Sequence, residues 1–136
     1  MNIEHVAIWT NRLEVLKDYY IKYFDATPNK KYTNPKTRFQ SYFLTFSSGA
    51  RLELMEKPAI PENKNDVEGQ QHLGIIHLAF GVERVEEVDA RAAQLKADGF
   101  KILRGPRETG DGYYEFETLD LDGNRLEVTT VITKTT

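Results

Sequence analysis

Two histidine–glutamate pairs occupy matching places in the two halves of this sequence. His5 begins the apolar run HVAIW, and Glu53 lies in RLELM. His77 begins HLAFGV, and Glu127 lies in RLEVT. The offset is 72 residues between the two histidines and 74 residues between the two glutamates. Similarity at a nearly constant spacing indicates an internal duplication.

The four side chains are of types that bind a divalent metal ion together. One histidine or glutamate alone on an apolar strand also fits a structural or solvent-facing role. A carboxylate between apolar residues is costly to desolvate, however, and favours a cation beside it. Two imidazoles and two carboxylates suit Ni, Co, Zn, Mn or Fe(II), and an octahedral shell then leaves two positions for water or substrate. We therefore predict one divalent metal per site, with His5, Glu53, His77 and Glu127 as ligands.

The two halves share one expected order of secondary structure. Helical spacing of apolar residues predicts a helix at 11–24, N-capped by Asn11 with Glu14 in the capping-box position. The same spacing predicts a second helix at 84–98, closed by Asp98-Gly99. Runs rich in aliphatic and aromatic residues predict strands at 3–9, 38–46 and 50–56 in the first half, and at 75–82, 100–104, 113–119 and 125–131 in the second.

The expected fold class is α+β, with two tandem βαβββ copies that form a cup-like mixed sheet around the metal. Copy 1 covers about 3–56 and copy 2 about 75–131, joined by a polar connection at 57–74 within a single domain of residues 1–136. Side chains alternate along a strand, so both glutamates face away from their apolar neighbours. The segment DLDGN predicts a hairpin turn at 120–124, because EF-hand spacing is missing.

Composition limits the classes of function. The net charge of −3 and the scattered basic residues give no reason to expect nucleic-acid binding. No apolar run approaches the roughly 18 residues that suggest a membrane span. The start MNIEHVAIW lacks a signal-peptide pattern, and the absence of cysteine excludes disulfides and thiolate sites. We therefore expect a cytoplasmic location, with neither a nucleic acid nor a membrane as a partner.

The order of these motifs resembles the vicinal oxygen chelate superfamily, the glyoxalase/bleomycin resistance/dioxygenase family. The resemblance extends from about Ile3 to Thr129 and includes HVAIW, LEL, HLAF and the specific closing motif DLDGNRLEV. It implies metal ligands at the two histidines and two glutamates of the repeat, a small-molecule substrate and a homodimer. A His/Glu/His/Glu set is most similar to that of glyoxalase I, whereas extradiol dioxygenases typically use two histidines and one glutamate.

Similarity to glyoxalase I implies a metal-dependent lyase or isomerase. Its reaction converts the hemithioacetal of methylglyoxal and glutathione to a thioester through an enediolate, as in lactoylglutathione lyase. By this resemblance Glu127 moves a proton between neighbouring carbons, and Glu53 serves as a ligand and second proton shuttle. The identity of the thiol co-substrate is left unassigned. Trp9 stands near the place where the bacterial enzyme has an arginine that helps to bind glutathione.

Four residues are expected to contact an anionic substrate: Arg38, Lys57, Arg104 and Tyr114. The last two lie in RGPRETGDGYY at 104–114, which we interpret either as a lid over the substrate or as an exposed hairpin connection.

Two alternative functions fit the same residues. One is another enzyme of the superfamily, either of the fosfomycin type that transfers a thiol or water, or an epimerase. The other is a small-molecule-sequestering protein of the bleomycin-resistance type. Such proteins usually lack the metal-ligand set, which this chain retains.

Overall fold

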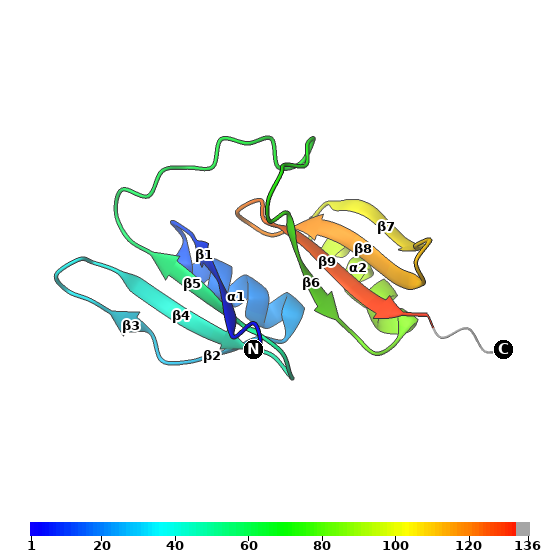
Figure 1. The fold of residues 1–136 in the computed structure, drawn as a ribbon, viewed down its shortest axis with the longest axis horizontal. Coiled ribbons are helices and arrows are strands. Elements are labelled where there is room, and N and C mark those ends of the chain that lie inside the picture. The colour runs from blue at the N-terminus through cyan, green and yellow to red at the C-terminus, as the bar shows by residue number, and fades with distance from the viewer. Residues whose placement is uncertain (133–136) are drawn as a thin grey trace. The chain divides into compact units, whose positions relative to one another are not determined.

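The computed structural model describes residues 1–132, and the chain divides into two compact units, Met1–Lys64 and Asn65–Thr136. Each unit contains one long helix and one mixed sheet (Figure 1). The units repeat one plan, which confirms the predicted α+β class and the two βαβββ modules.

The first unit begins with a strand and a helix and continues with four strands. The sheet has the order β1-β5-β4-β2, and β3 pairs with β4. Strand β1 runs parallel to β5, whereas the other pairs are antiparallel. Two of the strands have only two residues, too few for an alternation that the sequence could reveal. The elements are β1 (His5–Trp9), α1 (Leu13–Phe24), β2 (Thr27–Pro28), β3 (Tyr32–Thr33), β4 (Gln40–Thr45) and β5 (Arg51–Glu56).

Helix α1 packs on one face of this sheet. Leu52 and Leu54 of β5 are buried, together with Leu16 and Tyr20 of the helix. Truncating such a buried leucine to alanine costs about 2–5 kcal/mol. This packing therefore holds β5, and with it Glu53, in a fixed orientation.

Helix α1 does not begin with the predicted cap. Its N-cap residue is Arg12 rather than Asn11, and no side chain caps the helix. The carboxylate of Glu14, predicted to complete a capping box, accepts a hydrogen bond from the Tyr42 hydroxyl over 2.9 Å and pairs with Lys31 over 2.8 Å. The capping-box prediction is therefore wrong, because tertiary partners compete successfully for this carboxylate.

The second unit has one helix and four strands. Its sheet has the order β6-β9-β8-β7, in which only the β6–β9 pair is parallel. Strand β7 extends beyond the predicted 104, so the segment expected as a loop is mostly strand and hairpin. This agrees with the hairpin interpretation, whereas a role as a lid over the substrate stays a prediction. The elements are β6 (His77–Gly81), α2 (Val85–Ala97), β7 (Ile102–Glu108), β8 (Tyr113–Leu119) and β9 (Arg125–Val131).

Helix α2 covers one face of the second sheet, with Val88 and Leu95 of the helix fully buried. The Glu87 carboxylate accepts a hydrogen bond from the N–H of Arg84 over 2.9 Å and so caps the first turn. The helix ends at Asp98 and Gly99, as predicted, with a φ of 90° at Gly99. Within residues 1–132, no helix has both the length and the apolar composition needed to cross a membrane.

The predicted turn at 120–124 sets the register between β8 and β9. An Asp120 carboxylate oxygen accepts hydrogen bonds from the N–H groups of Asp122 and Asn124, over 2.9 and 3.0 Å. The two strands then pair so that Glu117 stands opposite Glu127.

Candidate metal centre

Three metal-binding side chains come together on the second sheet. Nε2 of His77 lies 3.3 Å from a carboxylate oxygen of Glu127. Glu117 joins them, and one ligand-type atom from each residue lies within 4.8 Å of the other two. We call His77, Glu117 and Glu127 the unit-2 trio. Its members stand on β6, β8 and β9, which strand pairing holds side by side.

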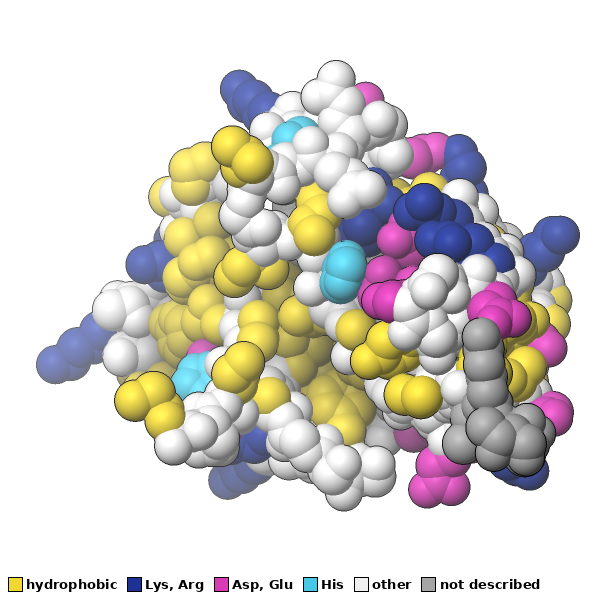
Figure 2. Space-filling model, turned by 45° about the vertical axis from the view of Figure 1, so that its right-hand side comes forward, with side chains coloured by type: hydrophobic (Ala, Val, Ile, Leu, Met, Phe, Trp, Pro, Cys, Tyr) yellow, Lys and Arg dark blue, Asp and Glu magenta, His cyan; other side chains and the backbone are white. Residues whose placement is uncertain are grey.

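Strand alternation places the unit-2 trio on the face opposite α2. Leu126 and Val128 flank Glu127 and are buried in the core of the unit. Successive side chains of a strand point to opposite faces, so Glu127 points away from that core. Residues paired across neighbouring strands share a face, and Glu117 therefore points the same way. In Figure 2, a histidine at the surface lies beside acidic side chains, and Lys and Arg side chains adjoin these.

The environment of Glu127 fits a bound cation. The residue is only 9% exposed. Burial raises the pKa of its carboxyl group above the usual value; the carboxylates of Glu115 and Glu117 add to the rise, while His77 opposes it. Two buried acidic side chains this close gain from a positive ion between them. The donor set thus suits a divalent metal of the borderline to hard class.

Glu117 is held from its other side by Arg125. Nη1 of Arg125 donates a hydrogen bond to Glu117 over 3.2 Å, and Nη2 donates to the Val67 carbonyl over 3.0 Å. The two side chains are only 8% and 11% exposed, for Arg125 and Glu117 respectively. This buried pair positions the Glu117 carboxylate beside Glu127.

Sequence analysis did not identify Glu117 or Arg125 as site residues. Alternation along β8 places Glu115 and Glu117 on one face of the strand. The same alternation is expected whether that face lines a site or faces solvent. The missing information is the register, which brings Glu117 opposite Glu127. Counting back through the predicted turn at 120–124 would have supplied this pairing.

The first unit carries its own histidine–glutamate pair. Nε2 of His5 lies 3.7 Å from a carboxylate oxygen of Glu53, whose side chain is largely buried. The two residues stand on the neighbouring parallel strands β1 and β5. Opposite Glu53 on β4, at the place that Glu117 occupies in the second unit, stands Phe43. At these matched positions the first unit therefore offers two donors where the second offers three.

Two of the predicted substrate contacts lie on different faces of the second sheet. Arg104 of β7 stands opposite Glu117, beside the unit-2 trio. Tyr114 instead donates a hydrogen bond from its hydroxyl to Asp89 of α2 over 2.6 Å. The structure thus brings Arg104 to the candidate centre and places Tyr114 on the side of the helix.

The other two predicted contacts belong to the first unit. Arg38 is exposed between β3 and β4 and has a φ of 60°. Lys57 follows β5, and its ammonium lies 5.3 Å from the centre of the Trp9 ring. Both are cations at the surface of that unit, and their role in substrate binding stays a prediction.

Comparison with known proteins gives a family and a set of similar structures. Residues 2–128 match the profile of the Glyoxalase/Bleomycin resistance protein/Dioxygenase superfamily. The chain is similar to a glyoxylase/bleomycin resistance protein/dioxygenase domain from Frankia sp. EAN1pec, with 18% identity and a TM-score of 0.78 over 96% of this chain and 98% of that one. It is also similar to a glyoxalase family protein from Enterococcus faecalis, with 26% identity and a TM-score of 0.72 over 93% and 95%. For the trypanothione-dependent glyoxalase I of Leishmania major the identity is 20% and the TM-score 0.73, over 96% and 86%. No curated protein matches the chain.

Proposed function

The chain belongs to the glyoxalase/bleomycin resistance protein/dioxygenase superfamily, and we propose that it is a metal-dependent lyase of the glyoxalase I type. The observation that carries this proposal is the buried Glu127 carboxylate beside His77, repeated in the first unit by Glu53 beside His5. One similar structure is that of a glyoxalase I, which supports the same reaction class. The proposed substrate is a thiol–aldehyde adduct, with the thiol unassigned.

The proposed metal ligands are the two histidine–glutamate pairs, and Glu117 stands beside the second pair as an alternative donor. A divalent ion held there, Ni, Zn, Co or Mn, supplies Lewis-acid chemistry that polarises two neighbouring substrate oxygens and acidifies the adjacent C–H bond. Glu117 offers its carboxylate oxygen beside His77 and Glu127. The ligands proposed from the repeat are His5, Glu53, His77 and Glu127.

Glu127 is the proposed base. Its buried carboxylate belongs to the unit-2 trio, so it would stand next to a substrate held at the metal, as a general base must. The carboxylate takes the proton from one carbon and returns it to the neighbouring carbon, so the substrate is isomerised without loss or gain of atoms. Glu53 has the proposed role of ligand and second proton shuttle.

Metal loading followed by turnover tests this function. Protein stripped with a chelator and dialysed is reloaded separately with Ni, Co, Zn or Mn, then given methylglyoxal with glutathione and other small thiols. We expect about one ion per chain, as in a catalytic site with open positions. We also expect thioester formation, reduced at least about a hundredfold in Glu127→Gln, the usual effect of losing a general base.

Glu86→Gln is the matched control, because it removes an exposed carboxylate in the first turn of α2, outside the unit-2 trio. It should retain both metal and turnover. Metal binding without turnover on every thiol would contradict the lyase. Failure to bind any of the four metals would contradict the metal centre itself.

A further inference from the structure

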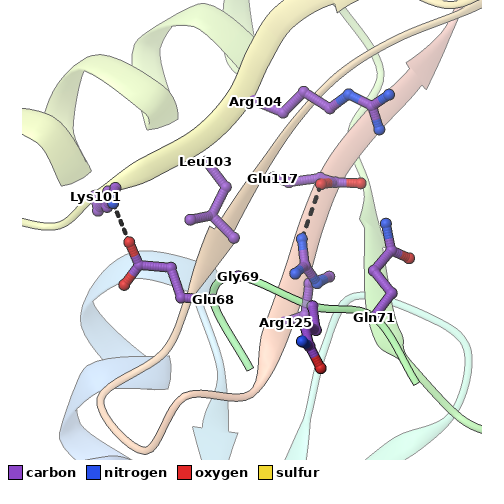
Figure 3. A pocket seen from close by; sticks show the side chains of 9 residues that line it. Glu68, Gly69, Gln71, Lys101, Leu103, Arg104, Glu117 and Arg125 are labelled. Carbon is purple, nitrogen blue, oxygen red and sulfur yellow. Dashed lines mark hydrogen bonds and ion pairs between the residues drawn. The ribbon is translucent and has the colours of Figure 1, made fainter. Parts of the chain in front are cut away.

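The chain just before β6 is fastened to the rest of the second unit at two points. The Val67 carbonyl accepts a hydrogen bond from Nη2 of Arg125 over 3.0 Å. The next residue, Glu68, pairs with Lys101, and Figure 3 shows these two side chains pointing toward each other. We call residues 66–71 the strap, because they are tied to β9 at one point and to the residue before β7 at the other.

The strap fits against Gly123. This glycine lies in the turn between β8 and β9 and has a φ of 84°. A Cβ atom added at Gly123 would lie 2.9 Å from a methyl carbon of Val67, closer than side-chain carbons approach in folded proteins. The missing side chain of Gly123 thus leaves room for Val67, whose carbonyl then meets Arg125.

The strap also forms one wall of a cavity beside the unit-2 trio. The cavity has a volume of about 440 Å³, and residues 68–71 of the strap line it. Glu117, a member of the unit-2 trio, lines it as well. Displacement of the strap would therefore open this side of Glu117 to solvent. The remaining wall consists of Lys101, Leu103, Arg104 and Arg125.

Arg125 connects the strap to the candidate metal centre. Its Nη2 is held by the Val67 carbonyl, and its Nη1 donates a hydrogen bond to a carboxylate oxygen of Glu117 over 3.2 Å (Figure 3). Both side chains of this ion pair are largely buried. The Val67 carbonyl, Arg125 and Glu117 thus form one line of contacts, and movement of the strap removes the first of them.

The strap is held weakly enough to open. Its ion pair lies at the surface, with the Glu68 and Lys101 side chains 50% and 66% exposed, so solvent screens the attraction. Nε of Arg125 is buried without a hydrogen-bond partner in the described part of the chain, as is Nε2 of His72, directly after the strap. Unsatisfied buried groups favour an opening that lets water reach them. The closed strap is therefore balanced against an open one.

We propose that the strap positions the Glu117 carboxylate for metal binding, with Val67 and Arg125 as positioning residues; the metal-binding part rests on the proposed function. In the closed strap Arg125 is fixed from both sides and engages one oxygen of Glu117, so the second oxygen remains for a cation. In the open strap Arg125 loses one support, and Glu117 loses its fixed orientation. A hydrogen-bonded partner that orients a ligating carboxylate typically raises metal affinity 10- to 100-fold. Closure thus tightens metal binding, and metal binding in turn favours closure.

Gly123→Ala tests the proposal, because its added methyl group displaces Val67 and with it the strap. Chelator-stripped and dialysed protein is titrated with Zn²⁺ in a calorimeter. We expect the dissociation constant to rise about tenfold, as for loss of an orienting partner. In the metal-free protein, NMR should show faster exchange of the Arg125 Nε–H with water. Saturating Zn²⁺ should slow that exchange in the unaltered protein.

Gly99→Ala is the matched control. Gly99 also has a positive φ, 90°, but a Cβ added there meets nothing within 4 Å. This variant therefore carries similar backbone strain without touching the strap, and it should keep the Zn²⁺ affinity and the exchange rate of the unaltered protein. The double variant Val67→Ala/Gly123→Ala removes the clash and should recover most of the Zn²⁺ affinity.

Equal weakening of Zn²⁺ binding by Gly99→Ala and Gly123→Ala would assign the effect to backbone strain and overturn the proposal. Faster exchange in Gly123→Ala with unchanged Zn²⁺ affinity would also overturn it, because the strap would then not act on the centre.

A measurement without metal separates this proposal from the proposed function. Glu117→Gln weakens the contact with Arg125, since a neutral amide binds a guanidinium group less strongly than a carboxylate does. The Arg125 Nε–H should therefore exchange faster in metal-free Glu117→Gln. Unchanged exchange would contradict the line of contacts from Glu117 to the strap. Failure of the unaltered protein to bind Zn²⁺ would instead contradict the metal centre.

Discussion

At the scale of single residues, one position makes the two halves of the chain chemically unequal. The matched strand position holds Phe43 in the first unit and Glu117 in the second. An arginine lies two residues before each candidate glutamate ligand, and its contacts differ between the two units accordingly. Arg51 lies over the Phe43 ring, 4.1 Å from its centre, whereas Arg125 forms a buried ion pair with Glu117. The same strand position thus carries an apolar side chain in the first unit and a third candidate metal donor in the second.

Replacing Glu117 with the residue of the first unit tests how strongly this pair is coupled. Glu117→Phe should destabilise the protein by about 3–5 kcal/mol, because Arg125 would stay buried without its counter-charge. Glu117→Phe combined with Arg125→Met should recover most of that loss, since no buried charge is then unpaired. Urea unfolding of the four proteins measures the cycle. If the loss in the free energy of unfolding of the double variant equals the sum of the losses of the two single variants, the two side chains are not coupled.

At the scale of elements, the contacts of Glu14 tie α1 to the adjacent sheet. Lys31, Lys17 and the Tyr42 hydroxyl hold the pKa of this carboxyl group at about 2. The folded-state pKa lies below the ordinary value of 4.5, so the contact stabilises the fold above about pH 4.5. The stabilisation is lost as the pH falls toward 2, because the carboxylate becomes protonated in the folded state as well.

Glu14→Gln should therefore lower the melting temperature at neutral pH but not at pH 2. The Glu14 side chain is half exposed, so solvent screening limits its contribution to roughly 0.5–1 kcal/mol. That corresponds to about 2–5 °C for a chain of this length. Calorimetric melts from pH 7 to pH 2 test the trend, with Glu86→Gln in the first turn of α2 as control. A difference that persists unchanged at pH 2 would rule out this titration.

The strands show where local pattern predicts an element and where it does not. Strands β8 and β9 have the bounds expected from their sequence, 113–119 and 125–131, because alternation runs through them without interruption. Strand β7 continues past its predicted end through Gly105-Pro106, where its pairing with β8 is irregular. Glycine and proline are typical of loops, and only pairing with a neighbouring strand shows that this segment is extended.

At the scale of the whole molecule, we expect the chain to form a homodimer. Leu73 and Ile75, just before β6, have relative exposures of 104% and 90%. Burying a leucine or isoleucine stabilises an assembly by about 1.5–3 kcal/mol per side chain. These two exposed aliphatic side chains, separated only by Gly74, are therefore the proposed association surface.

The variant Leu73→Ser/Ile75→Ser should shift the protein toward monomer, with the dissociation constant of the dimer raised at least about tenfold. Light scattering coupled to size-exclusion chromatography over a dilution series measures this. Val15→Ser on α1 removes another exposed aliphatic side chain and should leave the dimer unchanged. A monomer for the unaltered chain, or a dimer insensitive to the double variant, would contradict the expectation.

The amino-acid sequence by itself determined the duplicated plan, the α+β class and the family. The plan depends on repetition and the class on alternation of apolar residues, and both can be read along the chain. The family follows from the resemblance of its motifs to a known superfamily. The sequence also singled out His5, Glu53, His77 and Glu127, whose joint binding of a metal stays a prediction. The predicted turn at 120–124 is enough to place Glu117 opposite Glu127, but only the tertiary structure decided that His77 joins them, that Arg125 holds Glu117 and that Arg104 stands beside a cavity. The physical reason is register: which residues face each other across a sheet depends on hydrogen bonds between segments distant in the chain, and a shift of one residue would turn each of these side chains to the other face.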